Sequence, residues 1–121
     1  MNKKKILIID DEPQVAEMLA VRLQANHYQV LTALNGKEGL EKLQREKPDL
    51  ILLDIKMPDW DGRELLAKIK GTAETSAIPV IMLTAVTDTR SILHSQEKRA
   101  ADYIMKPFNP EELLRQIRKY I

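Results

Sequence analysis

The chain has 121 residues, a length typical of one domain, and its 19 basic and 18 acidic residues leave a net charge of +1. Such a balanced charge gives no support to nucleic acid or an anionic membrane as a bulk partner. Cysteine is absent, which excludes disulfides, thiolate metal sites and a cysteine nucleophile. The sequence lacks both a signal-peptide core and an apolar run long enough to span a membrane, so it predicts a soluble cytoplasmic protein.

Short apolar runs alternate with longer stretches in which apolar residues recur three and four positions apart. Strands are expected at Ile6–Ile9, Tyr28–Ala33, Leu50–Leu53, Val80–Leu83 and Asp102–Met105. The first helix is expected to present Val15, Met18, Leu19 and Leu23 to the core, and the last helix Leu113, Ile117 and Ile121. This alternation predicts an α/β fold with a parallel sheet covered by helices on both faces.

Helix starts are marked by capping residues. Asn35 with Glu38, and Asp61 with Glu64, have the spacing of capping boxes. Asn109 precedes a proline that would occupy the first helical position.

Polar residues follow the expected strands at the points where the apolar runs stop. They are Asp10, Asp11, Asp54, Thr84 and Lys106. Because ligands of open α/β folds bind at the carboxyl ends of the strands, these side chains are expected to form one site. Close carboxylates raise one another's pKa unless a cation compensates them, and Mg²⁺ prefers one or two carboxylates with water and phosphate oxygens. The set therefore predicts a magnesium site at which a carboxylate accepts a phosphoryl group.

The segments "IDDEP", "DLILLDIKMPDWDG", "PVIMLTA" and "DYIMKPF", in this order and spacing, resemble the receiver domain of two-component response regulators. The resemblance extends over essentially the whole chain, residues 1–121, as a single domain. It implies a flavodoxin-like (βα)5 doubly wound sandwich whose five parallel strands have the order 2-1-3-4-5. The implied function is that of a signalling switch operated by phosphorylation and not that of an enzyme.

The resemblance also implies roles for the acidic residues. Asp54 would accept the phosphoryl group from a phosphohistidine of a sensor histidine kinase or of a phosphotransfer protein. Asp11, Asp54 and the backbone carbonyl of Lys56 would bind Mg²⁺, and Asp10 would act mostly through a coordinated water molecule.

The remaining roles concern the relay. Lys106 would hold a phosphoryl oxygen, and the bond between Lys106 and Pro107 would be cis. Thr84 would be the switch hydroxyl and Tyr103 the aromatic side chain that changes rotamer with it. The altered face would comprise the fourth helix, the fifth strand and the fifth helix. Its partner would be a downstream effector, or a second copy of the chain in a phosphorylation-dependent homodimer.

Two other functions remain open at this point. A Mg²⁺-dependent aspartyl phosphohydrolase is one, although enzymes resembling the haloacid dehalogenase group carry a D-x-D pair where this chain has adjacent aspartates. The other is a phosphorylation-independent interaction module, although such domains usually lose an acceptor, an acid or the lysine.

Residues 87–99 depart from the family pattern, and Trp60 is an unusual residue in an exposed loop. Residues 87–99 offer few apolar positions, since Gln96 and Glu97 occupy the inward face, and Arg99 stands where the family has glycine. A weakly anchored fourth helix is therefore expected. Trp60 lies in the loop after the acceptor, where partial packing and an exposed contact surface are equally expected.

Overall fold

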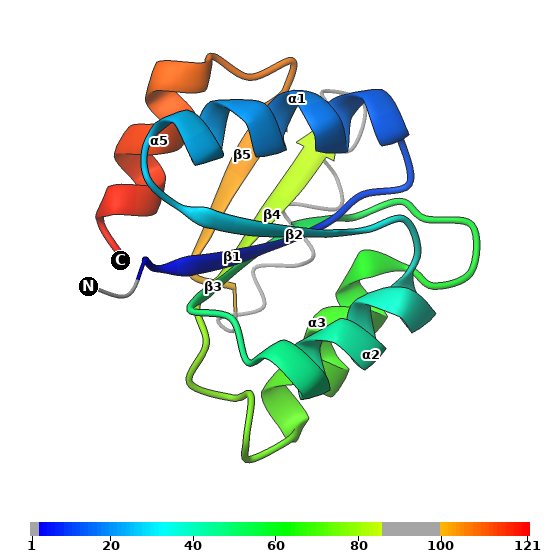
Figure 1. The fold of residues 1–121 in the computed structure, drawn as a ribbon. Helices are drawn as coiled ribbons and strands as arrows, with labels where there is room; N and C mark the ends of the chain where they lie inside the picture. Colours follow the sequence, from blue (N-terminus) through cyan, green and yellow to red (C-terminus); the bar gives the residue numbers. More distant parts are fainter. Residues whose placement is uncertain (1–2, 86–99) are drawn as a thin grey trace.

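The computed structural model describes residues 3–85 and 100–121, which form a parallel sheet of order β2-β1-β3-β4-β5 with helices on both faces (Figure 1). The strands are β1 (Lys5–Ile9), β2 (Gln29–Ala33), β3 (Leu50–Asp54), β4 (Val80–Ala85) and β5 (Asp102–Lys106). The helices are α1 (Pro13–Ala25), α2 (Gly36–Glu46), α3 (Gly62–Gly71) and α5 (Pro110–Arg118). The flavodoxin-like architecture and its strand order are confirmed. The expected fourth helix and Arg99 lie outside the described residues.

The sheet separates two cores because successive side chains of each strand point to opposite faces. In β1, Ile6 and Ile8 pack with α1 and α5, whereas Leu7 and Ile9 pack with α2 and α3. Figure 1 shows the same two pairs of helices on opposite sides of the sheet. Both faces of β1 and β3 are buried, which explains why these strands are continuous apolar runs.

Three strands extend beyond the apolar runs that predicted them. The ladder continues through the pairs Asp54 with Leu83, Thr84 with Met105, and Ala85 with Lys106. Backbone pairing does not depend on the polarity of the side chain, so the pleat continues into the polar residues. Asp54, Thr84 and Lys106 therefore lie within strands and not in the loops after them.

The buried face of α1 differs from the expected one. Leu19 and Leu23 are buried as expected, but Met18 is 53% exposed and Ala16 is buried in the core instead. The helix thus turns its small residue Ala16 towards the core that it shares with the sheet and α5. In α5 the expected face is correct, since Leu113 and Ile117 are buried. In the described part of the chain, no helix combines the length and apolar character needed to cross a membrane.

The helix caps form at the expected residues, but one has a different partner. Asn35 accepts a hydrogen bond from the backbone N–H of Glu38 at 2.8 Å, as a capping box requires. Asp61 instead accepts from the N–H and the guanidinium of Arg63, one residue earlier than the predicted Glu64. The guanidinium of Arg63 folds back and bonds the same carboxylate. This second contact orients the Asp61 side chain towards Arg63, the second residue of the helix, and not towards Glu64.

Gly62 provides a test of the close packing at the start of α3. A Cβ atom there would lie 2.3 Å from the carbonyl oxygen of Asp54 and 2.7 Å from Cα of Ile55, both of which are backbone atoms. Gly62→Ala should therefore lower the free energy of unfolding by about 2 kcal/mol or more, measured by urea denaturation. Gly71→Ala is the control, because a Cβ there meets nothing within 4 Å, and it should leave stability unchanged or slightly raised. Equal effects of the two substitutions would contradict the packing argument.

Candidate functional site

The carboxyl ends of β1, β3 and β5 bring two acids and a lysine together. Asp10 directly follows β1 and is fully buried, and Asp54 ends β3 with 6% of its surface exposed. Lys106 ends β5, and its ammonium reaches across the sheet edge to both carboxylates. Each of the three groups comes two residues after a side chain that is buried on the α1 and α5 side of the sheet. Asp10, Asp54 and Lys106 therefore lie on that same face.

The Lys106 ammonium is the cationic centre of this group. Its Nζ atom lies 2.9 Å from Oδ2 of Asp10, 3.6 Å from Oδ1 of Asp54 and 3.4 Å from Oε1 of Glu12. Burial on its own would lower the pKa of Lys106, but the Asp10 hydrogen bond and the neighbouring carboxylates together raise it. The lysine is therefore a permanent positive charge at neutral pH.

Asp54 is the acid whose titration is most altered. Its burial, followed by the charge of Asp10, raises the pKa of Asp54 to about 7, although Lys106 acts in the opposite direction. A hydrogen bond with Asp11 contributes to the same rise. One lysine thus does not compensate the carboxylates fully, and an additional cation would favour the ionised form of Asp54.

Asp10 is held by the backbone as well as by the lysine. Its Oδ1 accepts the N–H of Glu12 at 2.9 Å, and its own N–H donates to the carbonyl of Ala33 at 3.0 Å. The carboxylate therefore has little freedom to rotate, and its position is set by the turn that leads into α1.

Four carboxylates are close enough to share one cation. Asp10, Asp11, Glu12 and Asp54 each offer an oxygen, and these oxygens lie within 4.8 Å of one another. All the donors are hard oxygens, so the chemistry of the set fits Mg²⁺ better than a soft transition metal. The sequence predicted Asp10, Asp11 and Asp54 here but gave no role to Glu12. Its adjacency to the aspartate pair was the available signal, and its contact with Lys106 required the fold.

The loop after β3 is closed by backbone contacts between its two ends. The N–H of Gly62 donates to the carbonyl of Ile55 at 2.6 Å, and Lys56 pairs with Asp61 in an antiparallel bridge. Lys56 is exposed and lies two residues beyond Asp54. Across the sheet edge, the Lys106–Pro107 peptide bond is cis, as expected.

The two expected switch residues lie on neighbouring strands. Thr84 is fully buried in β4 and is paired in register with Met105 of β5. Tyr103, two residues earlier on β5, is half-buried and packs against the core on the α2 and α3 side. Since residues two apart on a strand point to the same face, Thr84 and Tyr103 share one face of the β4–β5 pair.

The model of the response regulator receiver domain matches residues 6–118. This chain belongs to that family. It is also 41% identical over 121 residues to a protein of Cyanophora paradoxa described as a probable transcriptional regulator, ycf27, covering all of this chain and 49% of the relative. The DNA-binding response regulator MtrA of Mycolicibacterium smegmatis is 35% identical over 96% of this chain and 50% of its own length. The receiver domain thus spans about half the length of these relatives.

Solved structures agree with the fold of this receiver domain. The chemotaxis response regulator CheY4 of Vibrio cholerae has a TM-score of 0.91 and 31% identity, covering 99% of this chain and 100% of that one. A CheY-like receiver domain protein of Methanospirillum hungatei has a TM-score of 0.89 and 36% identity, covering 98% and 93% of the two chains. Receiver domains are signalling domains that bind Mg²⁺ at an acidic pocket, and the receiver domain described here has an acidic cluster at the corresponding edge of its sheet.

The raised pKa of Asp54 predicts a pH dependence of stability in the metal-free receiver domain. Its folded pKa of about 7 lies above the value of an unfolded aspartate, so the native state retains a proton that the unfolded state has released. The stability from this proton is complete at low pH and is lost as the pH rises through 7. Between pH 5 and pH 8 the natural domain should lose about 2 to 3 kcal/mol more unfolding free energy than Asp54→Asn.

Urea denaturation at the two pH values, in buffer containing a chelator, measures this difference. Addition of Mg²⁺ should reduce it, because the metal stabilises the ionised carboxylate. Parallel pH profiles for the two proteins would show that Asp54 titrates normally.

Proposed function

We propose that Asp54 is the phosphoacceptor of this receiver domain and that Lys106, Asp10 and Asp11 prepare it for phosphoryl transfer. The observation that carries the proposal is the convergence of a buried acid with a raised pKa, a lysine within 3.6 Å of it and two further acids at one sheet edge. Perturbed acids of this kind, assembled beside a cation, are typical of functional sites.

The reaction is an in-line displacement on phosphorus. A carboxylate oxygen of Asp54 attacks the phosphorus of a phosphohistidine, the P–N bond breaks, and its electron pair stays on the imidazole, which takes up a proton from solvent. The product is an acyl phosphate on Asp54. The Lys106 ammonium then lies where it balances charge on a phosphoryl oxygen, because it already approaches the acceptor carboxylate.

The residues that would hold Mg²⁺ are Asp11, Asp54 and the backbone carbonyl of Lys56, with Asp10 acting through a water molecule. When bound, Mg²⁺ neutralises charge on the phosphoryl oxygens and on the carboxylates. Glu12 contacts Lys106 at 3.4 Å and is 60% exposed at its side chain, so it remains free to turn towards solvent when a phosphoryl group engages the lysine.

The response is relayed through Thr84 and Tyr103. The buried Thr84 hydroxyl would move towards the phosphoryl group, and Tyr103 would fill the space that this movement opens on the same face. The surface that partners would bind includes β5 and α5. A sensor histidine kinase or phosphotransfer protein supplies the phosphoryl group. A downstream effector, or a second receiver domain, reads the altered face.

The acceptor is tested by labelling with a small-molecule phosphodonor such as acetyl phosphate in the presence of Mg²⁺. Intact mass spectrometry should show one added phosphoryl group in the natural protein and none in Asp54→Asn or in chelator. Lys106→Ala should slow labelling by about tenfold or more, because a charge beside the acceptor is lost. Undiminished labelling of Asp54→Asn would refute the assignment.

The same experiment separates the receiver function from a phosphohydrolase. A receiver domain modifies itself and turns over slowly, so sustained release of phosphate from varied phosphate esters would favour the enzyme. A phosphorylation-independent interaction module would bind its partners equally well with Asp54 and with Asn at this position.

The relay is tested by Thr84→Val, which removes the hydroxyl but keeps the volume of the side chain. Labelling of Asp54 should persist, whereas the change in the Tyr103 ring resonances on adding beryllofluoride should shrink or vanish, as measured by NMR of ring-labelled tyrosine. Thr84→Ser is the matched control because it restores the donor, and it should recover the change. An unaltered Tyr103 response in Thr84→Val would remove the hydroxyl from the relay.

A further inference from the structure

One carboxylate, Asp59, joins the loop after β3 to the first turn of α2. Its Oδ1 accepts the N–H of Gly36 at 3.0 Å, and its Oδ2 accepts the N–H of Lys37 at 3.1 Å. The next N–H, that of Glu38, donates to Asn35 at 2.8 Å. The first three N–H groups of α2 are thus all bonded, two by a separate segment of the chain and one by the helix's own cap.

The electrostatics favour this contact. The N-terminal end of a helix carries partial positive charge, and an anion bonded to its free N–H groups is stabilised there. Although burial acts in the opposite direction, the hydrogen bonds from Gly36 and Lys37 hold the pKa of Asp59 below its usual range. The bond is therefore between an ionised carboxylate and a helix terminus at neutral pH.

Trp60 adds an apolar contact beside the ionic one. A Cβ atom on Gly36 would lie 2.9 Å from Cβ and 3.0 Å from Cγ of Trp60, so the tryptophan packs directly on the glycine. In addition, Nζ of Lys68 in α3 lies over the Trp60 ring, 4.8 Å from its centroid. Of the two expectations for Trp60, partial packing is what the structure shows. We call Asp59, Trp60 and Gly36 together the tether.

The tether connects the two halves of the proposed magnesium site. One half is the loop that carries Lys56, and the other is the end of β1, where Ile9 directly precedes the acids. The helix α2 contacts both halves, since its first turn bonds Asp59 and its Gly39 packs so closely on Ile9 that a Cβ would be 2.7 Å from Cδ1 of that residue. Asp59 therefore holds the loop to a helix that is itself in contact with the acid-bearing strand.

We propose that Asp59 is a positioning residue that fixes the Lys56 carbonyl relative to the β1 acids, so that the magnesium ligands are pre-organised. The proposal rests on the function proposed above. Without the tether, the metal must order the loop when it binds, which lowers its affinity but does not alter the chemistry at saturating metal. A positioning role thus predicts a change in the Mg²⁺ midpoint and not in the limiting rate.

The test is a titration of the metal-free chain with MgCl2, followed by the fluorescence of Trp60, the single tryptophan, and by thermal protection. Asp59→Ala should raise the midpoint by about fivefold, while its rate of labelling by acetyl phosphate at saturating Mg²⁺ stays within about twofold of the natural rate. Amide exchange at Gly36 and Lys37 should accelerate. Asp59→Asn keeps one acceptor oxygen and should give an intermediate midpoint.

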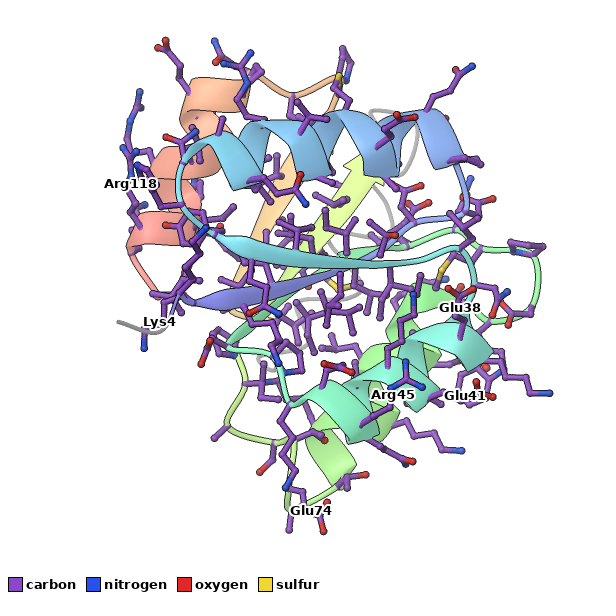
Figure 2. The ribbon with its side chains drawn as sticks, viewed as in Figure 1. Lys4, Glu38, Glu41, Arg45, Glu74 and Arg118 are labelled. Atoms are coloured by element: carbon purple, nitrogen blue, oxygen red, sulfur yellow. The ribbon has the colours of Figure 1, made fainter. Side chains whose placement is uncertain are left out.

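Two control variants separate positioning from lost helix stability and from lost charge. Asn35→Ala removes the helix's own cap without touching the tether, and Glu41→Gln removes a negative charge from the exposed surface of α2 (Figure 2). Both should keep the natural midpoint to within about twofold. The proposal is overturned if either control shifts the midpoint as far as Asp59→Ala does.

Gly36→Ala disturbs the tether from its other side and provides a second test should Asp59→Ala not fold. Alanine suits a helix better than glycine, yet its methyl group must displace Trp60, so the midpoint should rise although the helix is favoured. Unchanged Mg²⁺ midpoints in both Gly36→Ala and Asp59→Asn would refute the positioning role of Asp59 but leave the proposed function standing. A natural chain that neither binds Mg²⁺ nor labels at Asp54 would refute the proposed function and this inference with it.

Discussion

The site depends on a buried charge balance in which Lys106 faces Asp10 and Asp54. Three ionisable groups at the ends of strands are costly to bury unless they are paired. Each lies on the same face of the sheet because the strands are parallel and their registers keep the pleats in phase. The five-stranded order is therefore what brings residues from opposite ends of the chain within bonding distance.

The charge balance at this edge is incomplete, and the consequence is the raised pKa of Asp54. One lysine serves several carboxylates, so Asp54 remains protonated at a pH where a free aspartate would be ionised. Any cation that enters the cluster releases this proton and stabilises the fold in the same step. Binding, protonation and stability are consequently linked through one residue, which suits a domain whose state must change on modification.

The elements around the acids limit their motion in different ways. Backbone hydrogen bonds hold Asp10, and a glycine without room for a side chain closes the loop after Asp54. The start of α2 is capped from that same loop. The acidic cluster is thus supported by helix ends and close backbone contacts and not by the carboxylates themselves, which repel one another.

The sequence by itself determined the architecture and predicted most of the charged residues that meet at one edge of the sheet. Apolar periodicity marked the described strands, and the polar residues that end them predicted a cluster of which the fold brings Asp10, Asp11, Asp54 and Lys106 together at a common edge. Only the tertiary structure decided the contacts that no period encodes. The packing of α1 on the sheet buried Ala16 in place of Met18, and folding brought Glu12 to Lys106 and Asp59 to α2. The periodicity of apolar residues predicts which face of a helix or strand a residue occupies. A contact between residues far apart in the sequence depends on distances that are set only when the chain is packed.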